Sequence, residues 1–326
     1  MLVDLFGFLL LAREASDGQT PKNVFLNKFS RFVVRTTLPY FVGTWKRVWV
    51  RENTALPYFL GENTTRPYFP ATALASSSSQ SVGIVTWNLL APQYAVAPKY
   101  PFRDHLDWSY RQALIIDILQ QCPTNDIICL QEVQVDKGED LQAAFQDTQM
   151  TILQQVPHHP VACAILVRNT HWTVLHTESR SRALLCILEH RTSGQSCARN
   201  QSAPLIITGD FNLWEAAAHP IYQILATGRI PQALPWDPQK IWLEAPSWAQ
   251  NLLPLTDTQA SQQQPTFARS SILDYIWVLP DLRVEDRWRY GNVLRRGDGT
   301  YPPQPWPNKQ VPSDHIPVGV LLKWNG

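Results

Sequence analysis

The sequence repeatedly places an acidic or amide residue where a short apolar run meets a loop. The run 205–207 leads into Gly209-Asp210-Phe211-Asn212, and Ser313-Asp314-His315 comes directly before the mostly apolar run 316–322. Runs of this kind are hydrophobic on both faces, which is typical of strands buried between two layers. They outnumber the helical stretches, so we expect an α/β domain with two packed, mainly antiparallel or mixed β-sheets flanked by helices.

A strand, a helix and a second strand are expected near the start of this domain. Residues 82–88 are β-rich and end at Asn88, and residues 126–132 are apolar until Glu132. Between them, residues 108–121 carry apolar side chains near helical spacing. A unit of this kind can bring Asn88 and Glu132 to one edge of a sheet.

Composition sets the size of the core and the kind of partner. With 326 residues and 44% hydrophobic composition, the chain can bury the core of one large domain and carry an extension. Its formal net charge of +1 gives no overall basic field, so contact with a nucleic acid must use a local groove. The five cysteines lack C-x-x-C spacing and mostly sit in apolar runs, which indicates buried free thiols. We expect a monomer in a reducing compartment, the cytoplasm.

Residues 1–80 differ from the rest and are expected to be a poorly ordered N-terminal extension before a domain at 82–326. The apolar run 5–12 is too short to span a bilayer, and Asp4 is the only charge before it. Neither a membrane anchor nor a signal peptide is therefore favoured. A transit segment for the mitochondrion or another organelle is the alternative to a cytoplasmic location. Three imperfect Pro-Tyr-Phe repeats here are too short to form a solenoid core.

The ends of the apolar runs carry three carboxylates and three amide or imidazole side chains. They are Glu132, Asp210, Asp314, Asn88, Asn212 and His315. Hard oxygen ligands without a Cys or His cluster favour Mg²⁺ or Mn²⁺ over Zn²⁺, and they predict metal-assisted phosphoester hydrolysis. For any one of these residues, a capping or turn role is the alternative.

Five short motifs occur in the order and context of a known family: Thr86-Trp87-Asn88-Leu89-Leu90-Ala91, Leu130-Gln131-Glu132-Val133, Gly209-Asp210-Phe211-Asn212, Leu273-Asp274-Tyr275-Ile276-Trp277 and Ser313-Asp314-His315. Over about residues 82–326, the chain resembles the endonuclease/exonuclease/phosphatase family. Within it, the chain looks most similar to the carbon catabolite repressor type deadenylases, which have nocturnin and Angel as relatives. The resemblance implies a DNase I-like four-layer αββα sandwich.

The resemblance also implies a metal region. Glu132 would be the metal carboxylate with Asn88 as its neighbour, and Asp314 would complete the region. The implied cofactor is Mg²⁺ or Mn²⁺, acting as Lewis acid and template.

Four further residues take catalytic roles by the same resemblance. Asp210 would orient or deprotonate the attacking water, and Asn212 would hold that water or a phosphate oxygen. Asp274 would buttress the ring of His315, which would stabilise the charge developing on phosphorus.

One motif of the family is missing. Its members carry Thr-His-Leu on the strand before the Asp-Phe-Asn strand, and this histidine contacts the scissile phosphate. That strand should fall at 190–204, where this chain has only the polar stretch 191–202. Thr170-His171-Trp172 follows Glu132 too closely to replace it, so His171 is expected in a turn or on the surface. We therefore expect a fold that lacks one strand and an enzyme with impaired activity.

The favoured hypothesis is a Mg²⁺-dependent phosphodiesterase, a 3′–5′ exoribonuclease that removes adenylates from the 3′ poly(A) ends of RNA. Four aromatic residues near the motif ends are candidates for stacking on a base, with core packing as the alternative: Trp87, Tyr94, Trp214 and Phe267. Two rival hypotheses stay open: a phosphatase for a 2′-phosphorylated nucleotide or a cyclic-phosphate RNA end, and a non-catalytic paralogue that binds RNA or a protein. No leucine-rich repeat precedes the catalytic region, so docking in the large deadenylation complex is not expected.

Overall fold

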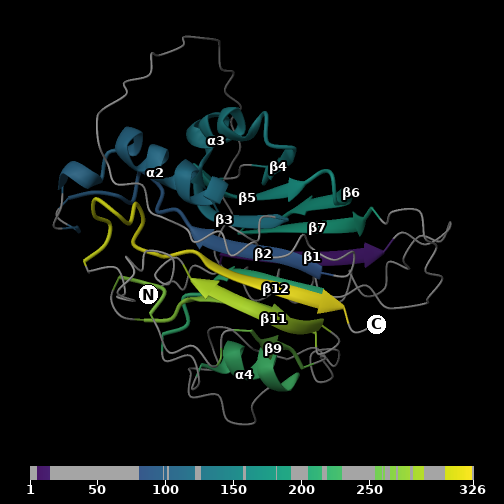
Figure 1. Ribbon diagram of the computed structural model, residues 1–326. Helices are drawn as coiled ribbons and strands as arrows, with labels where there is room; N and C mark the ends of the chain where they lie inside the picture. Colours follow the sequence, from purple (N-terminus) through teal and green to yellow (C-terminus); the bar gives the residue numbers. More distant parts are fainter. Residues whose placement is uncertain are drawn as a thin grey trace, which may run out of the picture.

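Two six-stranded sheets pack face to face and form the centre of the molecule (Figure 1). The computed structural model describes residues 6–14, 81–97, 99–100, 103–121, 126–156, 159–180, 182–191, 205–214, 219–229, 254–258, 260, 265–268, 271–279, 282–289 and 305–324. The Pro-Tyr-Phe repeats lie outside these residues.

The strands of each sheet come from distant parts of the sequence. Sheet A contains, in spatial order, β6 (Trp172–Ser179), β7 (Ala183–His190), β1 (Phe6–Glu14), β8 (Leu205–Asp210), β10 (Asp274–Val278) and β9 (Thr256–Asp257). Sheet B contains β11 (Leu282–Arg289), β12 (Val318–Trp324), β2 (Ser81–Asn88), β3 (Ile127–Gln134), β5 (Val161–Arg168) and β4 (Met150–Gln154). The β1–β7 and β2–β3 pairs are parallel, and the other described pairs are antiparallel.

Three apolar clusters show that the fold has four layers. Between the sheets, side chains of sheet B such as Ile84 meet side chains of sheet A such as Ile206. On the outer face of sheet B, Trp87 packs in one cluster with Ile115 of α2 (Trp108–Gln121) and Leu141 of α3 (Gly138–Phe145). On the outer face of sheet A, a third cluster contains residues of β8, β10 and α4 (Pro220–Thr227). The predicted αββα sandwich is therefore confirmed.

The strands are apolar on both faces because each sheet has a buried layer on either side. Every residue of β2 is buried, so its alternating side chains face the other sheet and the helices in turn. The helix α4 begins with Pro220 at its first turn and ends at Gly228, whose φ of 67° favours glycine. Two short 3₁₀ turns, Arg103–His105 and Val135–Lys137, precede α2 and α3.

Strand β1 was not expected. We predicted that residues 1–80 form a poorly ordered extension, but residues 6–14 form a strand in the middle of sheet A. This strand pairs with β7 on one side and with β8 on the other, so β7 and β8 do not pair with each other. The expected gap in the sheet is filled from the N-terminal side of the chain. Residues 192–204, where the family's histidine strand should fall, lie outside the described residues.

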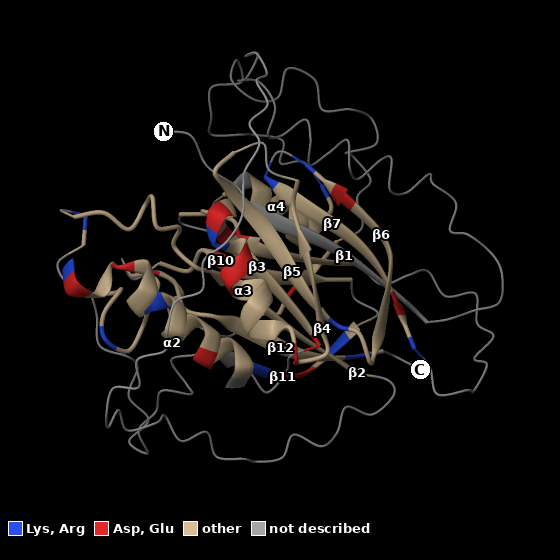
Figure 2. Cartoon of the chain, turned by 90° about the horizontal axis from the view of Figure 1, so that it is seen from above, with Lys and Arg blue, Asp and Glu red and all other residues tan. Residues whose placement is uncertain are grey.

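The described part of the chain agrees with two expectations from composition. Cys129, Cys163 and Cys186 are free and buried. Lys, Arg, Asp and Glu are spread over helices, loops and strand ends in Figure 2, without one large basic block in this view. Among the described residues, no helix is both long and apolar enough to cross a membrane.

Candidate active site

The predicted site residues meet at one edge of the two sheets. Asn88 is the last residue of β2, and Asp210 is the last residue of β8. Asp274 is the first residue of β10, which runs antiparallel to β8, so Asp274 is the register partner of Asp210. The Asn88 amide Nδ2 donates to Asp210 Oδ2 at 3.0 Å and joins sheet B to sheet A at this edge.

Glu132 reaches the site through an irregularity in β3. The register between β3 and β5 shifts between Leu130 and Val133, and Glu132 has a φ of 54°. Such a bulge can redirect a side chain out of the regular alternation of a strand. Glu132 Oε2 accepts a hydrogen bond from the Ala91 backbone N–H at 3.1 Å.

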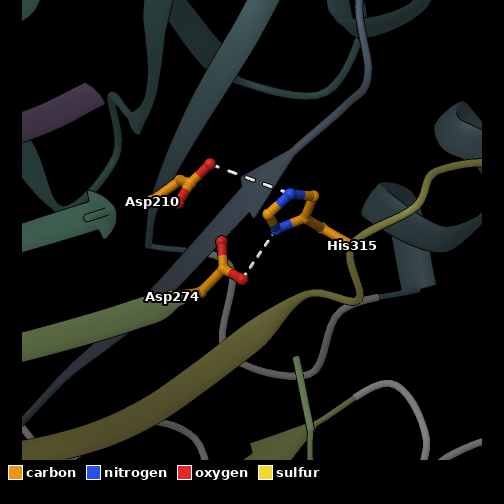
Figure 3. A group of neighbouring side chains, drawn as sticks. All are labelled: Asp210, Asp274 and His315. Carbon is orange, nitrogen blue, oxygen red and sulfur yellow. Dashed lines mark hydrogen bonds and ion pairs between the residues drawn. The ribbon is translucent and has the colours of Figure 1, made fainter. Parts of the chain in front are cut away.

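The His315 ring lies between two buried carboxylates (Figure 3). Its Nδ1 is 2.8 Å from Asp274 Oδ2, and its Nε2 is 3.7 Å from Asp210 Oδ2. Burial lowers the pKa of His315, but the charges of Asp274 and Asp210 more than offset this effect and raise the pKa to about 10. The imidazole is therefore positively charged at neutral pH.

Asp210 is held by its neighbours in the turn after β8. Its Oδ1 accepts a hydrogen bond from the Asn212 backbone N–H at 2.9 Å, and its Oδ2 lies 3.3 Å from Asn212 Nδ2. Asn212 has a φ of 50°, a conformation that asparagine adopts more readily than most residues. Burial raises the pKa of Asp210, and the charge of Asp274 adds to this, while the His315 cation opposes it.

The loop that carries His315 is fixed against the end of β2. Ser313 Oγ donates to the Asn88 carbonyl at 2.7 Å and accepts from the His315 backbone N–H at 3.1 Å. The indole Nε1 of Trp87 donates to the His315 carbonyl at 2.9 Å. Phe267 forms an isolated β-bridge with His315 on its other side. The position of the ring is thus set by contacts from the end of β2 and from the segment that carries Phe267.

Glu132 and Asp314 form the second half of the site. Burial raises the pKa of Glu132, and the negative charge of Asp314 raises it further, while Asn88 and His315 act in the opposite direction. The Tyr100 hydroxyl donates to Asp314 Oδ2 at 2.7 Å. Burial raises the pKa of Tyr100 above its ordinary value, and Asp314 adds to this, so the hydroxyl stays a donor.

These carboxylates fit a hard divalent cation. Glu132 and Asp314 repel each other. The charge of the buried Arg111 guanidinium acts on both, but neither carboxylate forms an ion pair with a Lys or Arg among the described residues. Ligand atoms of Asp210, Asp274 and His315 also lie within 4.8 Å of one another. There, however, His315 already supplies a positive charge and is bonded to Asp274. The oxygen atoms of Glu132 and Asp314 are the better donor set for such a cation.

Two residues of the site were missed in the sequence. Arg111 is fully buried in α2 and donates to three backbone carbonyls, those of Leu89, Leu106 and Pro312. It ties the loop after β2 to the loop that carries Asp314. A lone arginine inside an apolar helix was the only available signal. No sequence signal pointed to Tyr100, because it lies in a loop without a motif.

The aromatic candidates separate into two groups. Trp87 has no exposed surface and packs in the core beneath the helices, so its predicted stacking on a base is wrong. Tyr94 is half-buried and packs against a small apolar cluster with Leu90. Trp214 is 39% exposed and meets Phe267 edge to face, with ring centroids 5.7 Å apart. Phe267 lies 4.8 Å from the His315 ring and lines the site.

His171 lies away from the site. Its Nδ1 is 2.6 Å from Asp126 Oδ1, and Asp126 directly precedes β3, at the end opposite to Glu132. The ring is part of a turn before β6, as expected.

Comparison with known families agrees with this arrangement. The model of the Endonuclease/Exonuclease/phosphatase family matches residues 85–315. The chain belongs to this family. The match includes all the acidic site residues and His315, so the resemblance seen in the motifs is confirmed. The chain therefore has the hydrolase fold of the family.

Two solved structures show the same fold. The chain aligns with ANGEL2, a 2′,3′-cyclic phosphatase, in complex with adenosine-2′,3′-vanadate, at 16% identity and a TM-score of 0.57, over 76% of this chain and 96% of that chain. It aligns with the human nocturnin catalytic domain with bound sulfate at 19% identity and a TM-score of 0.50, over 80% of this chain and 100% of that chain. No curated protein matches the sequence.

Proposed function

We propose that the chain is a Mg²⁺- or Mn²⁺-dependent phosphodiesterase that acts on the 3′ end of RNA, as a 3′–5′ exoribonuclease that prefers poly(A). The observation that carries the proposal is the His315 ring held between Asp274 and Asp210. A fixed imidazolium next to a carboxylate provides both a positive charge for a phosphoryl oxygen and a group that can accept a proton from water.

Each residue of this group has a distinct task. Asp274 keeps the His315 ring charged and fixes its orientation, and the ring offsets negative charge on the phosphoryl group. Asp210 orients the attacking water and accepts its proton, which its raised pKa favours. Asn212, bonded to Asp210, holds that water or a phosphoryl oxygen.

Glu132 and Asp314 would hold the cation, with Asn88 beside them. A bound Mg²⁺ or Mn²⁺ supplies Lewis-acid polarisation of a phosphoryl oxygen. The raised pKa of Glu132 supports this assignment, because a nearby cation would offset both the burial and the Asp314 repulsion that raise it.

The half-exposed aromatic pair supports a nucleotide substrate. Phe267 lies beside His315, and Trp214 lies against Phe267, so a base could stack on this pair while its phosphate reaches the His315 ring. Because the net charge of the chain is only +1, binding of RNA would have to rely on such local contacts. The buried free thiols of Cys129, Cys163 and Cys186 support a reducing compartment, and we propose the cytoplasm.

A 2′,3′-cyclic phosphate end is the second candidate substrate. The similarity in fold to ANGEL2, a cyclic phosphatase in complex with adenosine-2′,3′-vanadate, favours it. Both candidates present a phosphodiester at the last nucleotide of an RNA, so the same residues would serve either reaction.

We also propose that turnover is low. The position between β7 and β8 holds residues 6–14, and this segment contains no histidine. It therefore brings no counterpart of the phosphate-contacting histidine to the site. If the absence of this histidine abolishes turnover completely, the chain is a non-catalytic RNA-binding protein.

The test compares three substrates: oligo(A) with a free 3′ hydroxyl, RNA with a 2′,3′-cyclic phosphate and a 2′-phosphorylated dinucleotide. Release of AMP from oligo(A) that depends on Mg²⁺ or Mn²⁺ and stops with EDTA supports the proposal. Reaction only at the cyclic or 2′-phosphate would replace the exoribonuclease by a phosphatase. A turnover equal to that of the human nocturnin catalytic domain or ANGEL2 assayed alongside would contradict the impairment.

Two histidine variants assign the activity to this site. His315→Ala should lower the rate by about 10²–10⁴-fold, the usual range for a lost acid–base or charge-stabilising group. His171→Gln changes a histidine far from the site and should leave the rate unchanged. If the protein binds RNA but does not cleave it with any added divalent cation, the non-catalytic alternative is supported.

A further inference from the structure

The central position of sheet A is filled by a segment far from its neighbours in sequence. Strand β1 pairs in parallel with β7 from Gly7↔Ala183 to Glu14↔His190. It pairs antiparallel with β8 from Phe6↔Asp210 to Leu11↔Leu205. The next described strand of the chain, β2, begins only at Ser81. Figure 1 shows β1, in purple, beside β7 among strands of later sequence.

The position between β7 and β8 requires an apolar strand. On one face, Leu184 and Cys186 of β7 and Ile206 of β8 belong to the core between the sheets. On the other face, Leu185 and Ile207 belong to the cluster that contains α4. Any strand placed between them is therefore covered on both sides, and polar side chains would be costly there.

The sequence of residues 6–14 meets this requirement. It reads Phe-Gly-Phe-Leu-Leu-Leu-Ala-Arg-Glu, with its charged residues only at the end that pairs with Glu189 and His190. The backbone gives a second reason for a strand here. Without one, the N–H and C=O groups along β7 and β8 would face each other across an empty row in the middle of a sheet, and buried groups of this kind must be paired.

We propose that the domain has a strand-acceptor site between β7 and β8, that this site takes an apolar extended peptide, and that residues 6–14 of the same chain are its occupant. Binding by strand addition uses backbone hydrogen bonds for affinity and side-chain contacts on both faces for selectivity. The inference rests on the sheet alone and does not depend on the reaction.

The occupant also supports the catalytic edge. Phe6 is the register partner of Asp210 on one side, and Asp274 is its partner on the other. Strand β8 is thus held from both sides at the residue that carries the catalytic carboxylate. Removing β1 should therefore loosen Asp210 as well as the centre of sheet A.

A cross-link tests the position and the origin of the strand. Leu10 is in register with Cys186, and paired residues of neighbouring strands share a face. The variant Leu10→Cys should form a disulfide with Cys186 under mild oxidation, detected as a linked peptide by mass spectrometry. The matched control Leu9→Cys is in register with Leu185, on the other face, and should not link to Cys186. The link should form within one chain.

Failure of Leu10→Cys to link above the level of Leu9→Cys would overturn the proposal. A link found only between two chains would overturn it as well, because a second copy would then be the donor.

A stability measurement tests whether the strand matters. Proline lacks the N–H that a central strand needs, so Leu9→Pro should lower the Tm by roughly 5–10 °C. The control Asp136→Pro, at an exposed residue in the first turn of a 3₁₀ helix, should change the Tm far less. In a chain lacking residues 1–14, hydrogen exchange at 183–190 and 205–210 should rise, and a synthetic peptide of residues 4–16 should restore protection where a scrambled peptide does not. Equal Tm values for the two proline variants, or unchanged exchange in the shortened chain, would exclude the site. If the shortened chain does not fold, the comparison of the two proline variants and the Leu10→Cys cross-link still test the proposal.

Discussion

The hydrogen bond between His315 Nδ1 and Asp274 Oδ2, 2.8 Å long, joins the loop before β12 to the first residue of β10. Both side chains are buried, so neither partner can exchange the other for water. Burial alone would discharge the imidazole, and the nearby carboxylates reverse this effect. The positive charge of the site therefore depends on Asp274.

Replacing Asp274 with asparagine should discharge His315. In Asp274→Asn, the amide can keep a hydrogen bond, but it carries no charge, so burial should lower the pKa of His315 from its raised value. NMR titration of the imidazole in the metal-free protein measures this shift. Activity should fall by about 10²-fold because the ring is neutral at pH 7. An unchanged His315 pKa would mean that Asp210 alone sustains the charge.

Tyr100 should affect the cation more than the chemistry. Its hydroxyl donates to Asp314, so Tyr100→Phe removes one contact that orients a proposed ligand. Loss of such a contact commonly weakens metal binding by about tenfold or more. The Mg²⁺ concentration for half-maximal activity should rise accordingly, while kcat at saturating Mg²⁺ changes little. Tyr110→Phe, which removes an exposed hydrogen bond to the Lys309 carbonyl, is the control and should change neither value.

The sequence was sufficient to find the acids and their histidine. Asp210 and Asp274 stand at strand ends, where an apolar run meets a loop, and such positions can be read from a local pattern. The two layers of strands followed from runs that are apolar on both faces. The role of Trp87 could not be predicted correctly. A tryptophan at a strand end packs in the core if helices cover it and lines the site if they do not, and the local sequence does not show which of these applies.

Long-range pairing was not visible in the sequence. Residues 6–14 read as an apolar segment of no clear role, since their partners in β7 and β8 lie far along the chain. Arg111 raised the same difficulty, because the three carbonyls that accept its hydrogen bonds come from separate loops. Local patterns give the type of an element but not the distant groups that it meets.

Arg111 should be essential for stability. Arg111→Met keeps the apolar stem but leaves the buried carbonyls of Leu89, Leu106 and Pro312 without this donor. Buried groups left unpaired cost about 1–3 kcal/mol each, so the free energy of unfolding should fall by about 3 kcal/mol or more. Urea denaturation measures the change. Arg103→Met, at an exposed arginine of the preceding 3₁₀ turn, should fall within about 0.5 kcal/mol of the unchanged protein.

Glu132 should illustrate a conflict between stability and cation binding. Burial and the charge of Asp314 raise its pKa, so its ionised form is unfavourable in the metal-free fold. Glu132→Gln removes this charge, and its amide oxygen can still accept from the Ala91 N–H. The Tm of the metal-free variant should therefore be a few degrees higher than that of the unchanged protein at pH 7.

The pH dependence of this gain follows from the direction of the shift. In the window between the ordinary pKa of glutamate and the raised value, the folded chain binds more protons than the unfolded chain, so the unfavourable contribution grows as pH rises. The advantage of Glu132→Gln should fade as pH is lowered toward the ordinary glutamate range. Added Mg²⁺ should reverse the order, because it raises the Tm of the unchanged protein and has little effect on the variant. Thermal scans with EDTA and with Mg²⁺ measure both effects, and equal Mg²⁺ shifts for the two proteins would remove Glu132 from the cation site.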